Sequence, residues 1–431
     1  MAETERARLL ERPRPRELPI APAAPSARRR LPLHAETRAV DRQFRPIYAV
    51  WELTLRCDLA CRHCGSRAGR ARHDELTTAE CLDLVAQMAE LGVLEVTLIG
   101  GEAYLRDDFE AIVRALAARR MLVSMTSGGR GITPELAARC KDAGMQQVSI
   151  SIDGLRETHD RLRGVEGAFD SALAALGHLR AAGLSISCNS QINRLSAPDL
   201  PPLLEVLAEL GVKAWQLALT VPMGRAADEP DVLLQPYDLL EVFPMLGALA
   251  ARADELGVRL WPGNNVGYFG PYEGVLRGTA PRRQSGSCSA GKLVLGIEAD
   301  GAIKGCPSLP TEAWTGGNVR DASLKDIWER AEPLRYTRDR TVDDLWGYCR
   351  TCYYADECRA GCTWTSFVFF GRAGNNPYCH HRALELQRAG KRERLERTRP
   401  APGAPFDHGS FEIIEEPCAT TSSPSTQENR S

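Results

Sequence analysis

A repeating unit of strand, helix and glycine is the feature that most restricts how this chain can fold. Short apolar and β-branched runs recur between residues 47 and 261, and amphipathic helical stretches lie between them. Several of these stretches stop at a glycine, for example Gly92 and Gly144, which can close a helix in the left-handed conformation. Strands that alternate with helices need right-handed crossovers and a parallel sheet. The pattern therefore predicts an α/β fold with at least six βα units, as a doubly wound sheet or as a full or partial barrel.

Residues that can do chemistry follow the expected strands. These strands are expected at residues 48–53, 95–99, 121–125, 148–152, 185–188, 215–217 and 258–260. A cysteine-rich loop follows the first strand, Gly100, Gly101 and Glu102 follow the second, and Asp153 follows the fourth. Functional residues of βα folds gather on the loops after the carboxyl ends of the strands, so we expect one site there.

Composition excludes several classes of protein. With 43% hydrophobic residues and a net charge of -2, the 431-residue chain lacks the basic surplus of a nucleic-acid-binding protein. It has no run of eighteen apolar residues, so no membrane span is expected. The N-terminus lacks the apolar core of a secretory signal, which predicts a cytoplasmic protein. In that compartment fourteen cysteines favour metal ligation over disulfides.

Three cysteines, Cys57, Cys61 and Cys64, stand at C-x3-C-x2-C spacing after the first strand. One tight loop can aim all three thiols at a single point, and three thiolates suit a soft metal centre such as an iron–sulfur cluster. A [4Fe–4S] cluster has four irons, so three local ligands leave one iron for a small molecule or a distant residue. For the triplet alone, a zinc knuckle remains the alternative.

The cysteine triplet, together with Gly100, Gly101 and Glu102 after the second strand, resembles the radical S-adenosylmethionine superfamily. This resemblance implies a partial (βα)6 TIM-like barrel in which the three cysteines hold a [4Fe–4S] cluster and S-adenosylmethionine chelates the open iron. It also implies reductive cleavage of that cofactor to a 5′-deoxyadenosyl radical, which abstracts hydrogen from the substrate. The electron would come from a donor such as flavodoxin or ferredoxin.

The resemblance also assigns contacts with S-adenosylmethionine. The position beside the adenine, usually aromatic in the family, is a histidine here, and imidazole can stack too. Two glycines at a strand end let backbone approach the cofactor, and a carboxylate complements its ammonium group. A serine and an arginine match positions that contact the cofactor's carboxylate, although an ordinary surface charge is the alternative for the arginine. The expected cofactor contacts are His63, Gly100, Gly101, Glu102, Ser151 and Arg163.

A second group of cysteines lies in the last third of the chain. Its seven positions resemble the SPASM extension, which holds two auxiliary iron–sulfur clusters, here expected to be of the [4Fe–4S] type; a zinc ribbon is the alternative. By that resemblance the ligands of the outer cluster are Cys349, Cys352, Cys358 and Cys379. Those of the inner cluster are Cys288, Cys306 and Cys362. No eighth cysteine lies between Cys288 and Cys306, so the inner cluster is expected to have an open iron or a non-cysteine ligand.

The chain divides into four expected segments. They are a disordered basic arm over residues 1–45, the barrel over 46–261, the SPASM domain over 262–390 and a mostly disordered tail over 391–431. Within the SPASM domain, residues 317–319 and 324–328 look like that domain's hairpin and short helix.

The leading hypothesis is a radical enzyme that oxidatively modifies or crosslinks a peptide or protein, because SPASM-bearing members of the family largely act on such substrates. The alternatives are a sulfatase-maturase-like oxidation of a side chain and a radical enzyme of tetrapyrroles or other small molecules. From another class comes a non-catalytic iron–sulfur electron carrier or scaffold, which would not need a cofactor site. The sequence leaves open the substrate, the bond formed, the general base and the oligomeric state.

Overall fold

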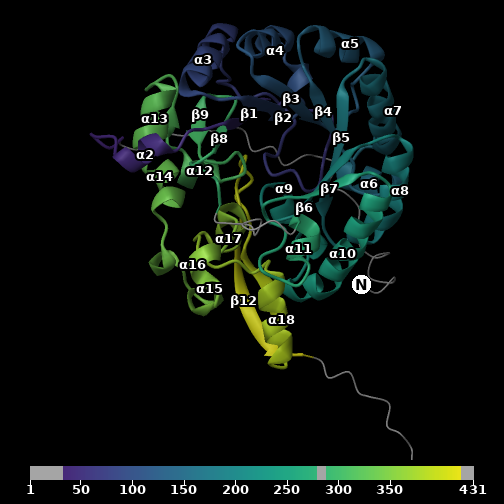
Figure 1. Ribbon diagram of the computed structural model, residues 1–431, viewed down its shortest axis with the longest axis vertical. Coiled ribbons are helices and arrows are strands. Elements are labelled where there is room, and N and C mark those ends of the chain that lie inside the picture. The colour runs from purple at the N-terminus through teal and green to yellow at the C-terminus, as the bar shows by residue number, and fades with distance from the viewer. Residues whose placement is uncertain (1–32, 279–287, 419–431) are drawn as a thin grey trace, which may run out of the picture.

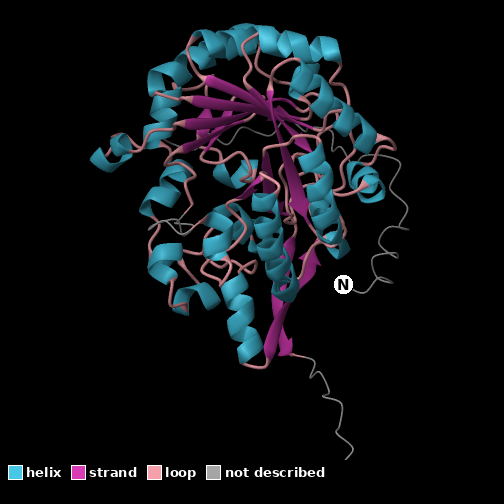
Figure 2. Ribbon diagram, turned by 45° about the vertical axis from the view of Figure 1, so that its right-hand side comes forward, coloured by secondary structure: helices cyan, strands magenta, loops and turns pink. Residues whose placement is uncertain are grey.

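A curved ten-stranded sheet forms the centre of the protein, and helices cover its outer side (Figures 1 and 2). The computed structural model describes residues 33–278 and 288–418. The strand order is β10-β9-β8-β1-β2-β3-β4-β5-β6-β7, so β1 to β7 are neighbours in chain order. Every pair from β1 to β7 is parallel, as in a barrel that has not closed. The predicted α/β partial barrel is confirmed.

The parallel strands and the helices between them lie where the sequence pattern places them. The strands are β1 Tyr48–Thr54, β2 Glu95–Gly100, β3 Leu122–Ser127, β4 Gln147–Ser151, β5 Ser185–Ile192, β6 Ala214–Leu219 and β7 Arg259–Pro262. The helices are α3 Thr78–Leu91, α4 Phe109–Ala118, α5 Pro134–Asp142, α6 Arg156–Arg163, α7 Ala168–Ala181, α8 Leu200–Glu209, α9 Arg225–Asp228 and α10 Leu239–Glu255.

Local sequence explains both ends of α3. The Thr77 hydroxyl accepts a hydrogen bond from the Glu80 backbone, and the Glu80 carboxylate accepts one from the Thr77 backbone at 2.7 Å. This reciprocal capping box starts the helix. Gly92 ends the helix with φ of 90°. Glycine adopts this left-handed conformation at little energetic cost because it has no Cβ.

The two faces of the barrel sheet differ in polarity. Successive strand residues point to opposite sides. On the outer side, Trp51, Met125 and Trp215 are at most 1% exposed, and the apolar residues of this side pack with the helices in one hydrophobic core. The inner set carries hydroxyl and amide groups, and a chain of hydrogen bonds links Tyr48 to Thr97 at 2.9 Å and Thr97 to Ser124 at 2.7 Å. The barrel interior is therefore polar.

One helical stretch in the described part of the chain, Pro230–Glu255, is long and apolar enough by composition to cross a membrane. Within it, 56% of the apolar window is buried inside the protein. Leu239, Phe243 and Leu246 are at most 2% exposed and belong to the main core. The packing identifies α10 as a core helix of the barrel.

The cysteine-rich segment begins by extending the barrel sheet. β8 (Val294–Ile297) pairs in parallel with β1, and β9 (Ala302–Lys304) and β10 (Gly317–Asn318) follow as antiparallel strands. The predicted hairpin and short helix are present, the helix as α13 (Leu324–Arg330). The other helices are α11 Glu273–Arg277, α12 Thr311–Trp314, α14 Glu332–Asp339, α15 Tyr348–Thr351, α16 Ala355–Cys358, α17 Thr363–Phe370 and α18 His380–Arg388.

The prediction of disorder over residues 1–45 is wrong where the structure describes this segment. Residues 39–43 form the short helix α2 (Ala39–Gln43), and the Asp41 side chain is fully buried. Its carboxylate contacts Arg38 at 2.8 Å, Arg335 at 2.9 Å and Arg338 at 3.1 Å. Two of these partners lie about three hundred positions away in sequence, so no local pattern could reveal them. Residues 1–32 lie outside the described residues.

The prediction of a disordered tail is also wrong over residues 391–417. This stretch forms an antiparallel hairpin of β11 (Lys391–Arg399) and β12 (Ser410–Pro417), shown in yellow in Figure 1. Apolar side chains anchor it, since Leu395 and Phe411 are buried and the Phe411 ring lies 5.6 Å from that of Phe369 on α17. Charged residues dominate the sequence of these strands, so the few apolar residues did not reveal a strand pattern. Residues 419–431 lie outside the described residues.

The buried carboxylate of Asp41 should be important for stability. Asp41→Asn would leave buried guanidinium groups without a counter-charge, so we expect a loss of about 3–5 kcal/mol in free energy of unfolding. Asp339→Asn removes a half-exposed partner of Arg38 and should cost less than about 1 kcal/mol. Denaturant unfolding of both variants measures this, and equal losses would contradict the role given to Asp41.

The Asp41 carboxylate should also make the free energy of unfolding depend on pH. Burial favours its neutral form, but hydrogen bonds from Arg38 and Arg338 and the charge of Arg335 outweigh this and lower its pKa from 3.8 to about 2. A lowered pKa in the folded protein stabilises it above the unfolded value. The contribution is thus complete above about pH 4 and is lost as the pH falls toward 2. Comparison of wild type and Asp41→Asn across this range should show their stabilities converging.

Candidate functional site

The cysteine loop follows the carboxyl end of β1 and brings three thiols together. The Cys61 and Cys64 thiols lie close enough to Cys57 to affect its ionisation. Burial is the main cause that raises the pKa of Cys57, and the negative charges of Glu102, Cys61 and Cys64 raise it further. Backbone N–H groups of Leu59 and Ala68 donate to the sulfurs of Cys57 and Cys64, both at 3.4 Å. Thiols ionise when a metal binds them, and N–H donors suit the resulting thiolates. The donor set fits one iron–sulfur cluster.

Several segments hold the backbone of this loop. The Ala60 and Arg62 N–H groups donate to carbonyl groups at the end of α6, at 3.0 and 2.8 Å. The guanidinium of Arg225, at the start of α9, donates to the Cys61 carbonyl at 2.6 Å and to the Ala68 carbonyl at 3.1 Å. The direction of the thiols is therefore fixed by contacts from outside the loop.

The two glycines after β2 allow the next turn to pack on the cysteine loop. A Cβ on Gly100 would lie 2.1 Å from the Thr54 carbonyl oxygen, and one on Gly101 would lie 2.1 Å from that of Arg56. Gly100 also has φ of 154°. The resemblance assigned these glycines to approach of the cofactor. The structure adds a reason within the protein, because only glycine fits so close to the β1 loop.

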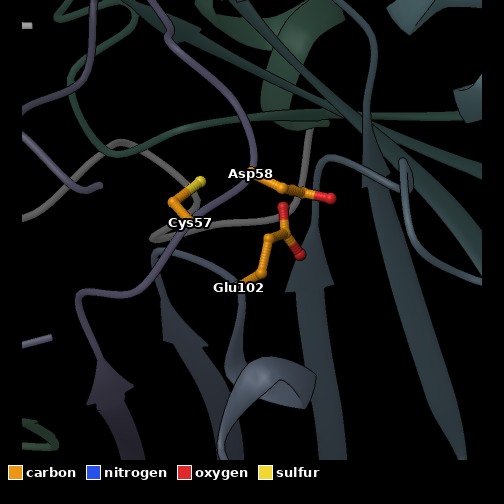
Figure 3. Close-up of side chains that lie close together, drawn as sticks. All are labelled: Cys57, Asp58 and Glu102. Atoms are coloured by element: carbon orange, nitrogen blue, oxygen red, sulfur yellow. The ribbon is translucent and has the colours of Figure 1, made fainter. Parts of the chain in front are cut away.

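Glu102 ends this turn as a buried carboxylate. It accepts hydrogen bonds from the Ser127 hydroxyl at 2.6 Å, at the end of β3, and from the backbone N–H of the next residue, Gly128, at 2.7 Å. Figure 3 shows it beside Asp58 and Cys57, and the ligand atoms of these three residues lie within 4.8 Å of one another. Burial raises the pKa of Glu102 to about 7, although the two hydrogen bonds lower it. Two carboxylates this close form a site for a cation.

A buried ionic group lies at the end of β4. Arg163 is 8% exposed, so it is not a surface charge, and its guanidinium contacts Asp153 at 2.7 Å and the Cys61 sulfur at 3.7 Å. Asp153 also lies 3.3 Å from His63 and is fully buried. Burial raises its pKa, but Arg163 and His63 outweigh this and lower it. Ser151, 6% exposed, ends β4 two residues earlier.

Asp153 is the residue whose role the sequence did not reveal. Its carboxylate contacts His63, on the cysteine loop, and Arg163, at the end of α6, and so links two expected cofactor contacts. Its position directly after a strand was the available signal, but its partners lie on the cysteine loop and at the end of α6. Arg163 places a cation beside the Cys61 thiol, and Glu102 places a carboxylate beside the Cys57 thiol.

The C-terminal cysteines gather into the two groups that the resemblance implies. One cavity is lined by tyrosines and by Cys349, Cys352, Cys358 and Cys379. The other three thiols interact, because burial and the charges of Cys288 and Cys362 raise the pKa of Cys306 to about 12. Four thiols in one group and three in the other fit two auxiliary clusters, the second with one ligand fewer. Their assignment as ligands remains a prediction.

Comparison with known proteins gives matches over both parts of the chain. A family model described as the radical SAM superfamily matches residues 51–193, and one described as an iron–sulfur cluster-binding domain, SPASM, matches residues 288–353. The crystal structure of Streptococcus suis SuiB bound to S-adenosylmethionine shares the fold, with a TM-score of 0.61 and 16% identity over 78% of this chain and 76% of SuiB.

Two kinds of curated relative have the same level of identity. AdoMet-dependent heme synthase of Methanosarcina barkeri is 30% identical over 358 residues, which cover 78% of this chain and 97% of the relative. Mycofactocin maturase MftC of Mycobacterium tuberculosis is 30% identical over 348 residues, which cover 78% of this chain and 83% of the relative. With these relatives, both family models and the cysteine geometry in agreement, the chain belongs to the radical S-adenosylmethionine superfamily as a SPASM-containing enzyme whose cofactors are S-adenosylmethionine and iron–sulfur clusters.

Proposed function

We propose that this enzyme oxidatively modifies or crosslinks a peptide or protein substrate. When bound, the cluster and S-adenosylmethionine supply a 5′-deoxyadenosyl radical that abstracts hydrogen. The chain's own residues would hold these groups and the substrate. An electron donor such as flavodoxin or ferredoxin would serve the site.

Each end of the amino-acid part of the cofactor has a complementary group. Glu102, with Asp58 beside it, would accept the ammonium group. Arg163, oriented by Asp153, would bind the carboxylate, and Ser151 lies on the same strand end. His63, held by Asp153, would lie beside the adenine. A non-catalytic carrier would not need this arrangement, which supports catalysis.

The polarity of the barrel's inner face is the observation that carries the choice of substrate. Register places neighbouring hydroxyl and amide groups on this face, and Gln147 donates to Ser187 at 3.0 Å. The Asn189 side-chain oxygen is buried and has no hydrogen-bond partner among the described residues. Over the six strands β1–β6, all described, the inner positions include no lysine or arginine. Uncharged donors and acceptors suit a peptide backbone.

The relatives named heme synthases support a competing substrate, a tetrapyrrole. Tetrapyrroles that lead to haem carry carboxylate side chains, and buried carboxylates need cations or several hydrogen bonds. The inner face of β1–β6 carries two carboxylates of its own, Glu95 and Glu52, and Glu52 already pairs with Arg72 at 3.0 Å, so these strands offer no unpaired cation to a substrate carboxylate. This charge pattern favours the peptide. A sulfatase-maturase-like oxidation stays within the peptide class.

Loss of the three loop cysteines should remove one cluster only. Replacing Cys57, Cys61 and Cys64 together with Ala should lower bound iron by about a third, if three four-iron clusters form, and abolish cleavage of S-adenosylmethionine. Cys140→Ala, a buried thiol on α5, is the control and should change neither. Iron analysis and chromatography of 5′-deoxyadenosine measure the two effects. Zinc as the sole metal, or cleavage that survives the triple change, would contradict the assignment.

Glu102→Gln should separate stability from cofactor binding. A pKa raised from 4.5 to about 7 in the folded protein means that the neutral form is favoured, so stability is lost as the pH rises through 7. Without cofactor, the variant should therefore be more stable than wild type at pH 8 by roughly 2–3 kcal/mol, and the difference should shrink toward pH 5.

The same variant should bind S-adenosylmethionine at least about tenfold more weakly, because an amide cannot neutralise the ammonium group. Unfolding curves and equilibrium binding measure the two properties. Glu110→Gln, on the exposed side of α4, controls for loss of a carboxylate. Lower stability at pH 8 together with unchanged binding would contradict the cation site.

Co-expression with short peptides encoded beside the gene tests the substrate class. Mass spectrometry should show a peptide that has lost hydrogen, or gained a crosslink, only when the enzyme is active. Asn189→Ala should raise KM for that peptide about tenfold while cleavage of S-adenosylmethionine persists. A parallel incubation with a carboxylated tetrapyrrole should give no product, and turnover of the tetrapyrrole alone would favour the competing function.

A further inference from the structure

Arg67, three residues after the last loop cysteine, has an unusual backbone. Its φ is 50°, in the left-handed region that a residue with a long side chain rarely adopts. Its N–H donates to the Cys64 carbonyl at 3.3 Å, and only 3% of the residue is exposed. Such a conformation persists only where surrounding contacts hold it. The cysteine loop therefore leads directly into a strained, buried residue.

Two carboxylates from distant segments hold the Arg67 side chain. Asp228 on α9 accepts from two of its nitrogens, at 2.6 and 2.9 Å. Asp407, in the turn between β11 and β12, accepts from Nε at 2.8 Å. The third interaction is with the Gly224 carbonyl at 2.9 Å. Each of the three guanidinium nitrogens thus donates at least one hydrogen bond, and the Asp407 side chain is 6% exposed.

The turn that carries Asp407 also binds the cysteine loop through its backbone. The Phe406 N–H donates to the Gly65 carbonyl at 3.1 Å, and the Asp407 carbonyl accepts from Gly224 at 2.8 Å. A Cβ on Gly224 would lie 2.3 Å from the Cys64 carbonyl oxygen, so the segment before α9 also packs directly on the cysteine loop. Figure 1 shows the hairpin running from the lower end of the molecule toward the barrel.

Asp407 is itself held rigidly. Its second carboxylate oxygen accepts from the Ala404 N–H at 3.0 Å and from the Gly403 N–H, which closes the turn. The hairpin strands pack on α17 and on the barrel, where the Leu395 N–H donates to Gln235 at 2.7 Å. A fixed carboxylate can fix its partner, which makes the contact with Arg67 more than a surface ion pair.

We propose that Asp407 is a positioning residue for the radical cluster, acting through Arg67 to hold the loop of Cys57, Cys61 and Cys64. The C-terminal hairpin thus forms part of the cluster site, although 343 positions separate Asp407 from Cys64. Without the Asp407 carboxylate, Arg67 keeps only its contacts on α9 and Gly224, and the strained residue can relax. The three thiols would then no longer be held in positions that let them bind one cluster.

Hydrogen exchange in the metal-free full-length protein tests the positioning directly. In Asp407→Ala, amides of residues 55–70 should exchange about tenfold faster than in wild type, while the barrel helices stay unchanged. Glu415→Gln removes the same charge from the far end of the hairpin, where it pairs with Lys391 at 2.6 Å, and should leave the loop as in wild type. Equal exchange of the loop in wild type and Asp407→Ala would overturn the proposal.

The loaded enzyme provides an independent readout that does not depend on the peptide substrate. Addition of S-adenosylmethionine to the reduced protein should change its electron paramagnetic resonance spectrum, because that cofactor binds the radical cluster. Asp407→Ala should lose most of this change and up to about a third of its iron, while the auxiliary clusters remain. Asp407→Asn, which keeps an oxygen for Arg67, should restore part of both. An unchanged spectral response in both variants, or loss of the auxiliary clusters together with the radical cluster, would contradict a specific positioning role.

Discussion

The convergence of three thiols on one short loop is the constraint on which the rest of the site depends. A loop of eight residues cannot hold Cys57, Cys61 and Cys64 in a fixed direction by itself. The structure supplies the missing contacts from outside, through the end of α6, through Arg225 and through Arg67. A loop held in this way needs a rigid scaffold around it, because its direction depends on residues that lie far from it in sequence.

Charge is arranged around the thiols in a way that complements an amino acid. Glu102 and Asp58 lie beside the Cys57 thiol, and Arg163 lies beside the Cys61 thiol, paired with Asp153. The buried carboxylate of Glu102 is raised in pKa in the absence of a cation and would ionise fully beside an ammonium group. The helix-facing side of the sheet forms the main hydrophobic core, whereas the inner side carries polar groups that hydrogen bond with one another.

The sequence predicted what depends on local pattern or on fixed spacing. Strand and helix periodicity placed the barrel, and the Thr77 and Glu80 pair placed the start of α3. The resemblance to the SPASM extension anticipated both groups of C-terminal thiols. The sequence could not predict contacts between distant charged residues. Asp41 and Asp407 lie in polar segments that resemble solvated tails, and each is ordered by arginines from elsewhere in the chain. Asp153 follows directly after a strand, where functional residues are expected, but its contacts with His63 and Arg163 are seen only in the structure.

Transfer of deuterium from substrate to 5′-deoxyadenosine is the most direct test that this site aims a radical at a peptide. The candidate neighbouring peptide would be made with deuterium at the carbon that changes, and the nucleoside product would be analysed by mass spectrometry. We expect one deuterium to appear in 5′-deoxyadenosine as the modified peptide forms. Formation of the modified peptide without that transfer, or transfer only from a deuterated tetrapyrrole, would contradict the assignment.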